Sequence, residues 1–460
     1  MARFETLQAW LNWQEQLHPK SIDLGLARVA GVYARLRSDR PAPLTVTVAG
    51  TNGKGSCVAF LEAIYRAQGY KVGAYTSPHI LRYNERIRIA GRSAGDAEIC
   101  DAFARIDAAR GETSLSYFEF GTLAALDLFA RADVDVQLLE VGLGGRLDAV
   151  NIVDPDATLV TTIALDHVDW LGNTVEAIAR EKAGIFRPGV PAVIGDQQPP
   201  ASLLATAAEI GAVTLRIGAA YRYRKRGEVW DWLGESAELL GLPVPALQGE
   251  HQYRNASAVI ATVQASNGRL PVGAEAIRRG VAEARLNGRF QLIDGSHPVL
   301  LDVGHNPQAV GTLLEYLSES FPNAKIRAVF AMMKDKDIAG VIRIMADRVA
   351  EWHLAPLANP RAAPPETIAA LFPPELRDRV RDGYPDFSAA YRAASGQAGP
   401  GELTLIFGSF FWYPNIYLIF PEVLEYGSGV KATIDWRRGN YRVGRHLRAD
   451  VVRRPNRRNR

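Results

Sequence analysis

Cysteines and long apolar runs are scarce in this chain of 460 residues. Only Cys57 and Cys100 occur, in no metal-ligand spacing, which favours a reducing cytoplasm over a disulfide-forming compartment. No stretch reaches the roughly eighteen apolar residues that a membrane span needs. Residues 1–5 lack the basic and apolar segments of a secretory signal. These absences predict a cytoplasmic protein that does not enter a membrane.

Charge is unevenly distributed along the chain. The net charge is +3, but residues 431–460 carry eleven Lys or Arg against Asp435 and Asp450, which leaves −6 for the first 430 residues. The folded body is therefore mildly acidic, and nothing in it predicts a nucleic-acid groove. The atypical basic tail, 426–460, is expected to be a disordered extension. The alternatives are a tail that binds nucleic acid or an anionic surface, and a sequence that arises from an altered reading frame.

Short apolar segments alternate with helix-like segments from about residue 44 onward. Apolar strands without polar alternation, separated by helices, are typical of a mostly parallel sheet that is covered on both faces. The expected strands of a first series are 44–48, 72–75, 136–141, 158–163 and 192–194, followed by a hairpin over 221–232 and a helix over 247–267. After a break in the pattern, a second series is expected at 299–303, 326–332, 351–354 and 403–407.

The segment 45–56 reads Thr-Val-Thr-Val-Ala-Gly-Thr-Asn-Gly-Lys-Gly-Ser. Its glycines let successive backbone N–H groups point at an anion, and the N-terminus of the following helix adds positive charge. Lys54 would reach the terminal phosphates of a nucleotide, and Ser56 would ligate Mg²⁺. An extra glycine separates the two residues, which argues against an ordinary kinase or GTPase. The segment nevertheless favours ATP binding.

These patterns predict an α/β protein of more than one domain, because the chain is too long for one ordinary core. A mostly parallel-sheet domain of the P-loop ATPase type is expected over 1–287. A linker over 288–297 and a smaller Rossmann-like α/β domain over 298–425 follow it.

Polar side chains follow three strands of the first series. Ser77 lies just beyond the second strand, Glu140 lies at the end of the third, and His167 follows the fourth. Ligands bind at the carboxyl ends of strands in open α/β sheets, so these side chains can form magnesium sites beside a triphosphate. Lys182, by contrast, is typical of a solvated helix lysine when it is considered alone.

Short motifs recur in order along most of the chain, at 49–56, 76–80, 82–86, 117–120, 142–148, 166–172, 181–188, 251–256, 288–290, 301–307, 335–337 and 407–410. Together they resemble bacterial dihydrofolate synthase/folylpolyglutamate synthase, of the Mur ligase superfamily. The resemblance implies an ATP-dependent ligase that adds L-glutamate to 7,8-dihydropteroate and to the γ-carboxylate of reduced folates. It implies an acyl-phosphate intermediate, release of ADP and phosphate, and a C-terminal glutamate-ligase domain.

The resemblance also implies roles for individual residues. It assigns ATP to Asn52, Gly53, Lys54, Gly55, Ser56, Asn255, Arg289 and Asp302. It assigns one Mg²⁺ to Ser77 and Glu140, a second to His167, and catalysis to Lys54, His167 and a carbamylated Lys182. It assigns the folate to Ser116, Tyr117, Phe118, Leu147, Asp148 and Ala149. His305 and Asp337 are further expected contacts for nucleotide or glutamate. A monovalent cation is an optional cofactor, and the enzyme is expected to be a monomer without a nucleic-acid partner.

Two other functions remain open at this point. One is another Mur-superfamily ligase, which joins an amino acid to a cell-wall precursor; only about 43 residues precede the phosphate strand, too few for an additional UDP-binding domain. The other is a non-enzymatic nucleotide- or nucleic-acid-binding protein that uses the basic tail.

Overall fold

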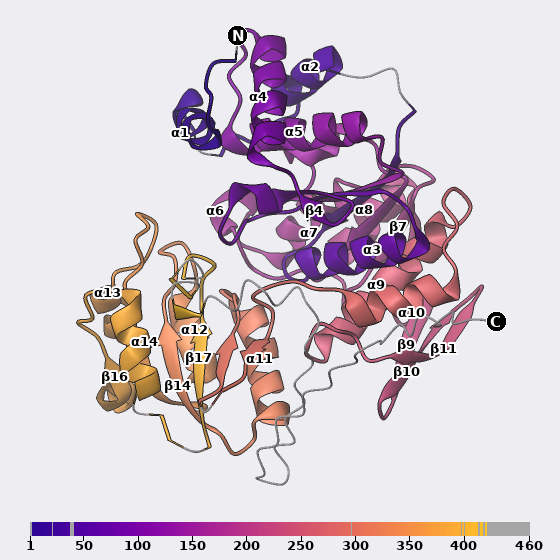
Figure 1. Ribbon diagram of the computed structural model, residues 1–460. Coiled ribbons are helices and arrows are strands. Elements are labelled where there is room, and N and C mark those ends of the chain that lie inside the picture. The colour runs from indigo at the N-terminus through magenta and orange to yellow at the C-terminus, as the bar shows by residue number, and fades with distance from the viewer. Residues whose placement is uncertain are drawn as a thin grey trace, which may run out of the picture.

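The computed structural model describes residues 2–20, 22–36, 41–295, 297–396, 398–399, 401–412, 415–416 and 419–420. These residues form two α/β units and a small antiparallel sheet (Figure 1). The basic tail predicted over 426–460 and the predicted end of the second domain at residue 425 lie outside the described residues. No described helix is long and apolar enough to cross a membrane.

The N-terminal unit is built on an eight-stranded sheet in the order β4-β3-β2-β5-β1-β6-β7-β8. The strands are β1 Leu44–Ala49, β2 Val72–Tyr75, β3 Ile87–Ile89, β4 Arg92–Ser93, β5 Val136–Glu140, β6 Ala157–Val160, β7 Pro191–Ile194 and β8 Val213–Arg216. Within this sheet only β3 runs opposite to the other strands, because it pairs antiparallel with both β2 and β4. All residues of β1, β2, β5 and β6 are buried. The prediction of a mostly parallel, doubly covered sheet is confirmed.

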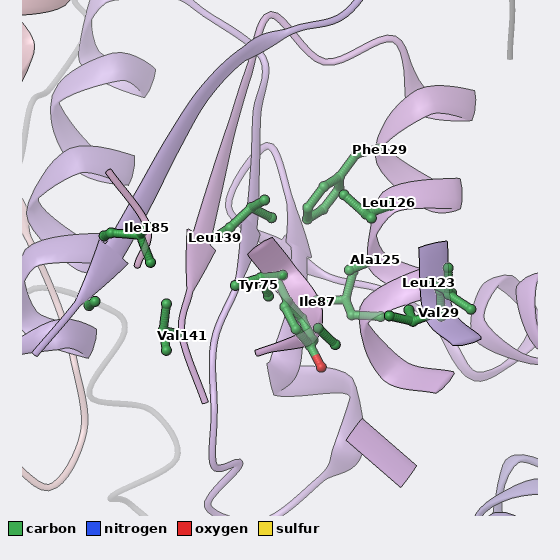
Figure 2. Packing of buried hydrophobic residues seen from close by; sticks show 14 of the residues in the cluster. Val29, Tyr75, Ile87, Leu123, Ala125, Leu126, Phe129, Leu139, Val141 and Ile185 are labelled. Atoms are coloured by element: carbon green, nitrogen blue, oxygen red, sulfur yellow. The ribbon is translucent and has the colours of Figure 1, made fainter. Parts of the chain in front are cut away.

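Helices cover both faces of this sheet. They are α1 Leu7–Leu17, α2 Ala27–Leu36, α3 Lys54–Gln68, α4 Asp96–Arg110, α5 Tyr117–Ala132, α6 Val168–Leu171, α7 Val175–Ala183, α8 Ala201–Ile210, α9 His251–Ser266 and α10 Ala274–Glu283. Alternate strand residues face opposite sides. Tyr75 and Leu139 lie in one core cluster with Phe129 of α5 (Figure 2), whereas Ala74 and Leu138 lie in the core of α3, α9 and α10.

The strand predicted over 158–163 ends early, at Val160. Residues 161–164 leave the sheet because they bond to the phosphate loop instead. Thr161 Oγ1 donates to the carbonyl of Asn52 (2.7 Å), and the Thr51 N–H donates to the carbonyl of Thr162 (2.6 Å). The polar side chains of this segment therefore serve the site rather than the sheet.

The predicted hairpin is confirmed as β9 Tyr221–Arg226 and β10 Val229–Gly234, to which β11 Glu238–Pro243 adds a third strand. The second unit has a six-stranded sheet in the order β12-β13-β17-β14-β15-β16. Its elements are β12 Gln291–Ile293, β13 Val299–Leu301, α11 Pro307–Ser320, β14 Lys325–Phe330, α12 Ile338–Met345, β15 Val349–Leu354, α13 Pro365–Ala370, β16 Val380–Arg381, α14 Phe387–Gly396 and β17 Glu402–Phe407. The predicted fold class is confirmed.

The segment predicted as a linker, 288–297, contains a short strand at Gln291–Ile293. These residues form β12, which pairs antiparallel with β13. Ile293 is buried in the core of the second unit with Val299 and Leu301. A strand of three residues is too short to give a periodic signal, and only its pairing makes it visible.

Candidate active site

The phosphate loop joins β1 to α3, and two of its glycines are required by its geometry. Gly50 has φ of 142° and Gly53 has φ of 96°, both unfavourable for side-chain-bearing residues. A Cβ on Gly50 would meet Thr161 Oγ1 at 1.8 Å, and one on Gly53 would meet Asn255 Oδ1 at 3.0 Å. The loop is therefore packed tightly against the segment that follows β6 and against α9, with the N-terminus of α3 directly behind it.

Two lysines converge on this loop from different elements. Lys54 Nζ donates to the carbonyls of Gly50 (2.9 Å) and Thr51 (3.1 Å), and Lys182 Nζ from α7 donates to the same Gly50 carbonyl (2.9 Å). Burial lowers the pKa of the Lys182 ammonium to about 7, and the nearby charge of Lys54 adds to that effect. Burial also lowers the pKa of Lys54. Lys182 is only 4% exposed, so it is not a solvated helix lysine.

Glu140 is a buried carboxylate at the end of β5. Its Oε2 accepts the backbone N–H of Ser77 (3.2 Å), so the two predicted ligands of one metal lie side by side. Burial raises the pKa of Glu140. Within the described residues no Lys, Arg or His nitrogen lies within 4.0 Å of this carboxylate, although buried charges are normally paired or bound to metal.

His167 and Asp166 lie at the border of the two units. Burial lowers the pKa of His167 to about 4, so its imidazole is neutral at pH 7 and can offer a lone pair. Its backbone has φ of 51°, a left-handed conformation that is uncommon for residues other than glycine. Asp166 accepts a hydrogen bond from Lys336 of the second unit (2.6 Å) and lies 3.7 Å from His305 Nε2. Burial alone would raise the pKa of Asp166, but these neighbours hold it well below its usual range.

The expected nucleotide contacts come from both units. Gln252 donates to Ser56 Oγ (3.3 Å) and accepts from Asn255 (3.0 Å), which links α9 to the phosphate loop. Asp302 is buried beyond β13, where its carboxylate accepts the N–H of Gly304 (2.7 Å), and burial raises its pKa. The guanidinium of Arg289 lies 5.2 Å from the centre of the Phe410 ring.

Side-chain hydrogen bonds of Asn52 also join the two units directly. Asn52 of the phosphate loop exchanges side-chain hydrogen bonds with Asn306, at 3.1 and 3.0 Å, and donates to Gln308 (2.7 Å). Asn306 also caps α11 by accepting the N–H of Ala309. The first turn of α11 is thus held against the phosphate loop.

Aromatic residues line the side of the site where a pterin is predicted. The ring of Phe118 fills the space beside Gly142, where a Cβ would approach it to 2.6 Å. The Asp148 carboxylate accepts the N–H groups of Leu143 (2.8 Å) and Val150 (3.1 Å). Burial raises the pKa of Asp148 to about 6. Ser116 caps α5, which begins at Tyr117.

The elements described above surround one cavity of about 610 Å³. It is lined by every residue predicted for ATP, metal and folate, and by His305 and Lys182. Asp337 is not among the lining residues: it is exposed and caps α12 through the N–H of Gly340 (2.8 Å). Its neighbour Lys336 lines the cavity instead.

Several lining residues have no role predicted from the sequence, among them Asp23, Arg86, Asp166, Arg254, Lys336 and Phe410. Asp166 and Lys336 belong to motifs that the sequence singles out, but their pairing depends on how the units pack. Asp23 comes from the N-terminal segment, where Arg28 bridges it to Glu119. That segment carries no local signal for a site.

Comparisons with known proteins agree with this geometry. The model of the Mur ligase middle domain matches residues 48–263, and that of the Mur ligase glutamate ligase domain matches residues 288–410. The chain is 44% identical to the dihydrofolate synthase/folylpolyglutamate synthase of Escherichia coli, covering 88% of this chain and 93% of that protein. It is 38% identical to the Haemophilus influenzae protein of the same name, covering 88% and 97%.

Solved structures are similar over nearly the same length. The structure of E. coli FolC in complex with DHPP and ADP has a TM-score of 0.86 and 42% identity, covering 91% of this chain and 99% of that chain. A bifunctional folylpolyglutamate synthase/dihydrofolate synthase with Mn, AMPPNP and L-glutamate bound has a TM-score of 0.83 and 44% identity, covering 91% and 98%.

Proposed function

This chain belongs to the dihydrofolate synthase/folylpolyglutamate synthase family and is an ATP-dependent ligase; from that premise we propose how its residues join L-glutamate to 7,8-dihydropteroate and to reduced folates. One observation carries the proposal. A single cavity connects a phosphate loop, two lysines and a buried carboxylate to an aromatic slot. That is the arrangement needed to bring a nucleotide, a flat heterocyclic acid and an amine together.

The reaction has two steps. A carboxylate oxygen of the acceptor attacks the γ-phosphorus of ATP, the bond to the β-phosphate oxygen breaks, and an acyl phosphate and ADP form. The amine of glutamate then attacks the acyl carbon, loses a proton, and phosphate leaves with the bridging oxygen. The phosphate loop and Lys54 hold the phosphates and offset their charge. Contacts between the units, such as Asp166 with Lys336, exclude water that would hydrolyse the acyl phosphate.

The donor set fits divalent metal ions. Glu140 with Ser77 offers a buried, otherwise unpaired carboxylate beside a hydroxyl, and His167 offers a neutral imidazole. No group of three or more His, Cys, Asp or Glu side chains with metal-binding geometry occurs in the described part of the chain. Mg²⁺ usually takes only one or two protein ligands together with water and phosphate oxygens. Two Mg²⁺ held by Ser77 with Glu140 and by His167 would neutralise charge on the transferring phosphoryl group.

Carbamylation of Lys182 fits its surroundings. Two ammonium groups share the Gly50 carbonyl, so their like charges repel one another at short range in a buried site. A carbamate on Lys182 would reverse one of these charges and attract Lys54. The reaction with CO₂ requires an unprotonated amine, and the pKa of about 7 makes that form available at neutral pH.

Two further properties are expected of the enzyme, a monomeric state and an optional monovalent cation. That the enzyme is a monomer stays a prediction. A monovalent cation stays a prediction, since no described residue points to its position.

We expect Glu140→Gln to raise the Mg²⁺ concentration for half-maximal activity by roughly tenfold or more, because the variant loses an anionic ligand. Titrating Mg²⁺ at saturating ATP measures the effect. Glu181→Gln, which removes a carboxylate paired with the exposed Arg146, is the matched control. Normal activity of Glu140→Gln at limiting Mg²⁺ would show that the metal assignment is wrong.

The choice of acceptors is tested by mass spectrometry of products. Dihydropteroate should gain one glutamate, and tetrahydrofolate should gain one or more. Absence of any glutamylated product with both acceptors would contradict the proposed function.

A further inference from the structure

Arg86 lines the cavity but has no role in the mechanism above. It ends the short 3₁₀ segment Tyr83–Arg86, directly before β3. Its carbonyl accepts the N–H of Thr76 (2.9 Å), the residue before Ser77. Its guanidinium lies 5.7 Å from the centre of the Tyr117 ring. Arg86 therefore lies between the predicted metal site and the predicted pterin slot.

The guanidinium is held in place through only one of its nitrogens. Arg86 Nε donates to His79 Nδ1 (2.8 Å), and the rings of Tyr83 and Tyr117 flank the group at 5.6 and 5.7 Å. Among the described residues no carboxylate lies within 4.0 Å of the guanidinium, and neither Nη has a hydrogen-bond acceptor.

The backbone around Arg86 is unusually well fixed. The Glu85 carboxylate accepts three successive N–H groups, those of Ile80, Leu81 and Arg82, at 2.7 to 2.9 Å. Arg88 bonds to Glu62 (2.9 Å) and to Thr76 (3.0 Å). A guanidinium fork on a rigid support loses little entropy when it binds a carboxylate with two parallel hydrogen bonds.

We propose that Arg86 binds the α-carboxylate of the glutamate on a folate acceptor and thereby distinguishes folates from dihydropteroate. The inference rests on the proposed function. A folate offers its γ-carboxylate for activation and keeps an α-carboxylate that does not react. Dihydropteroate has only the carboxylate that reacts, so it has no group for Arg86 to bind. Arg86 is then a specificity-determining residue for one of the two reactions.

The test compares three acceptors with wild type and Arg86→Gln. They are dihydropteroate, tetrahydrofolate, and a tetrahydrofolate analogue in which 4-aminobutyrate replaces glutamate and so removes only the α-carboxylate. The last two are measured as inhibitors of dihydropteroate glutamylation, so the result does not depend on whether they are extended. Arg82→Gln is the control, because Arg82 lies on the same segment but is exposed and contacts Asp96.

We expect wild type to bind tetrahydrofolate roughly ten- to hundredfold more tightly than the analogue, the usual range for a charged hydrogen-bonded pair. Arg86→Gln should bind the two alike, with the KM for dihydropteroate within about threefold of wild type. Arg86→Lys keeps the charge without the fork and should show an intermediate preference.

Two results would overturn the proposal: equal binding of tetrahydrofolate and the analogue by wild type, or an equal loss for all three acceptors in Arg86→Gln. Turnover of dihydropteroate by Arg86→Gln shows that this variant is folded. If Arg86→Gln is insoluble, the preference of Arg86→Lys for tetrahydrofolate over the analogue is measured instead. Failure of the proposed function would look different, because wild type itself would then not glutamylate dihydropteroate.

Discussion

Lys54→Ala lowers the rate of ATP-dependent glutamylation by about a thousandfold or more, while the protein remains folded. Lys54 is a cation of the phosphate loop itself, and removing one preorganised donor to a developing charge typically costs about 10²–10³ in kcat. Its position is fixed by hydrogen bonds to the carbonyls of Gly50 and Thr51. The fold should tolerate its loss, because burial of the ammonium already lowers its pKa and so costs stability when the group is charged.

The measurement is ADP release with dihydropteroate and glutamate at saturating ATP, with circular dichroism as the test of folding. Lys71→Ala is the matched control, since Lys71 is an exposed lysine just before β2 that bonds to the carbonyl of Ala132. Lys54→Arg should also be severely impaired, because the guanidinium fork does not fit the place of a compact ammonium. A Lys54→Ala enzyme with more than about a tenth of normal activity would contradict the assignment.

Lys182→Ala is expected to reduce turnover by about a hundredfold or more, and acetate or formate should restore part of the loss. A small carboxylate can occupy the space of the missing carbamate and return its negative charge beside Lys54. Lys182→Arg is the control, because it can neither be carbamylated nor leave space for an acid. Activity is measured over a series of formate concentrations. Full activity of Lys182→Ala, or equal rescue by a small cation, would exclude a carbamate.

Carbamylation of Lys182 also predicts how the recovery of activity depends on pH. Carbamylation consumes the neutral amine, and a group with a pKa of about 7 is about half neutral at pH 7 and mostly charged at pH 6. At an equal concentration of dissolved CO₂, enzyme depleted of CO₂ should therefore regain activity faster at pH 8 than at pH 6. Recovery that is independent of pH, or faster in acid, would count against it.

Much of the scaffold is predictable from local patterns. The buried strands and the glycine-rich loop carry their signals within a few residues, and β1 with α3 matches the expected strand, loop and helix. The short strands β3, β4, β12 and β16 carry no such signal, because two or three residues give no periodicity.

Some residues of the site are likewise predictable from the sequence, whereas others are not. Ser77, Glu140 and His167 follow strands, so the topology of a parallel sheet already brings them to one edge. The environment of Lys182 is different: its burial and its contact with Gly50 arise from the packing of α7 against a loop 132 residues earlier in the chain. Only the resemblance to a family singles it out from the sequence. The pairing of Asp166 with Lys336 likewise depends on how the two units meet.

The central claim is that the acceptor carboxylate is activated as an acyl phosphate. Dihydropteroate labelled with ¹⁸O in its carboxylate tests this most directly, because amide formation keeps one carboxylate oxygen and phosphate leaves with the other. Mass spectrometry should find one ¹⁸O in each inorganic phosphate released, with ADP as the nucleotide product and one ¹⁸O in dihydrofolate. Unlabelled phosphate, or label in AMP with release of pyrophosphate, would contradict the mechanism.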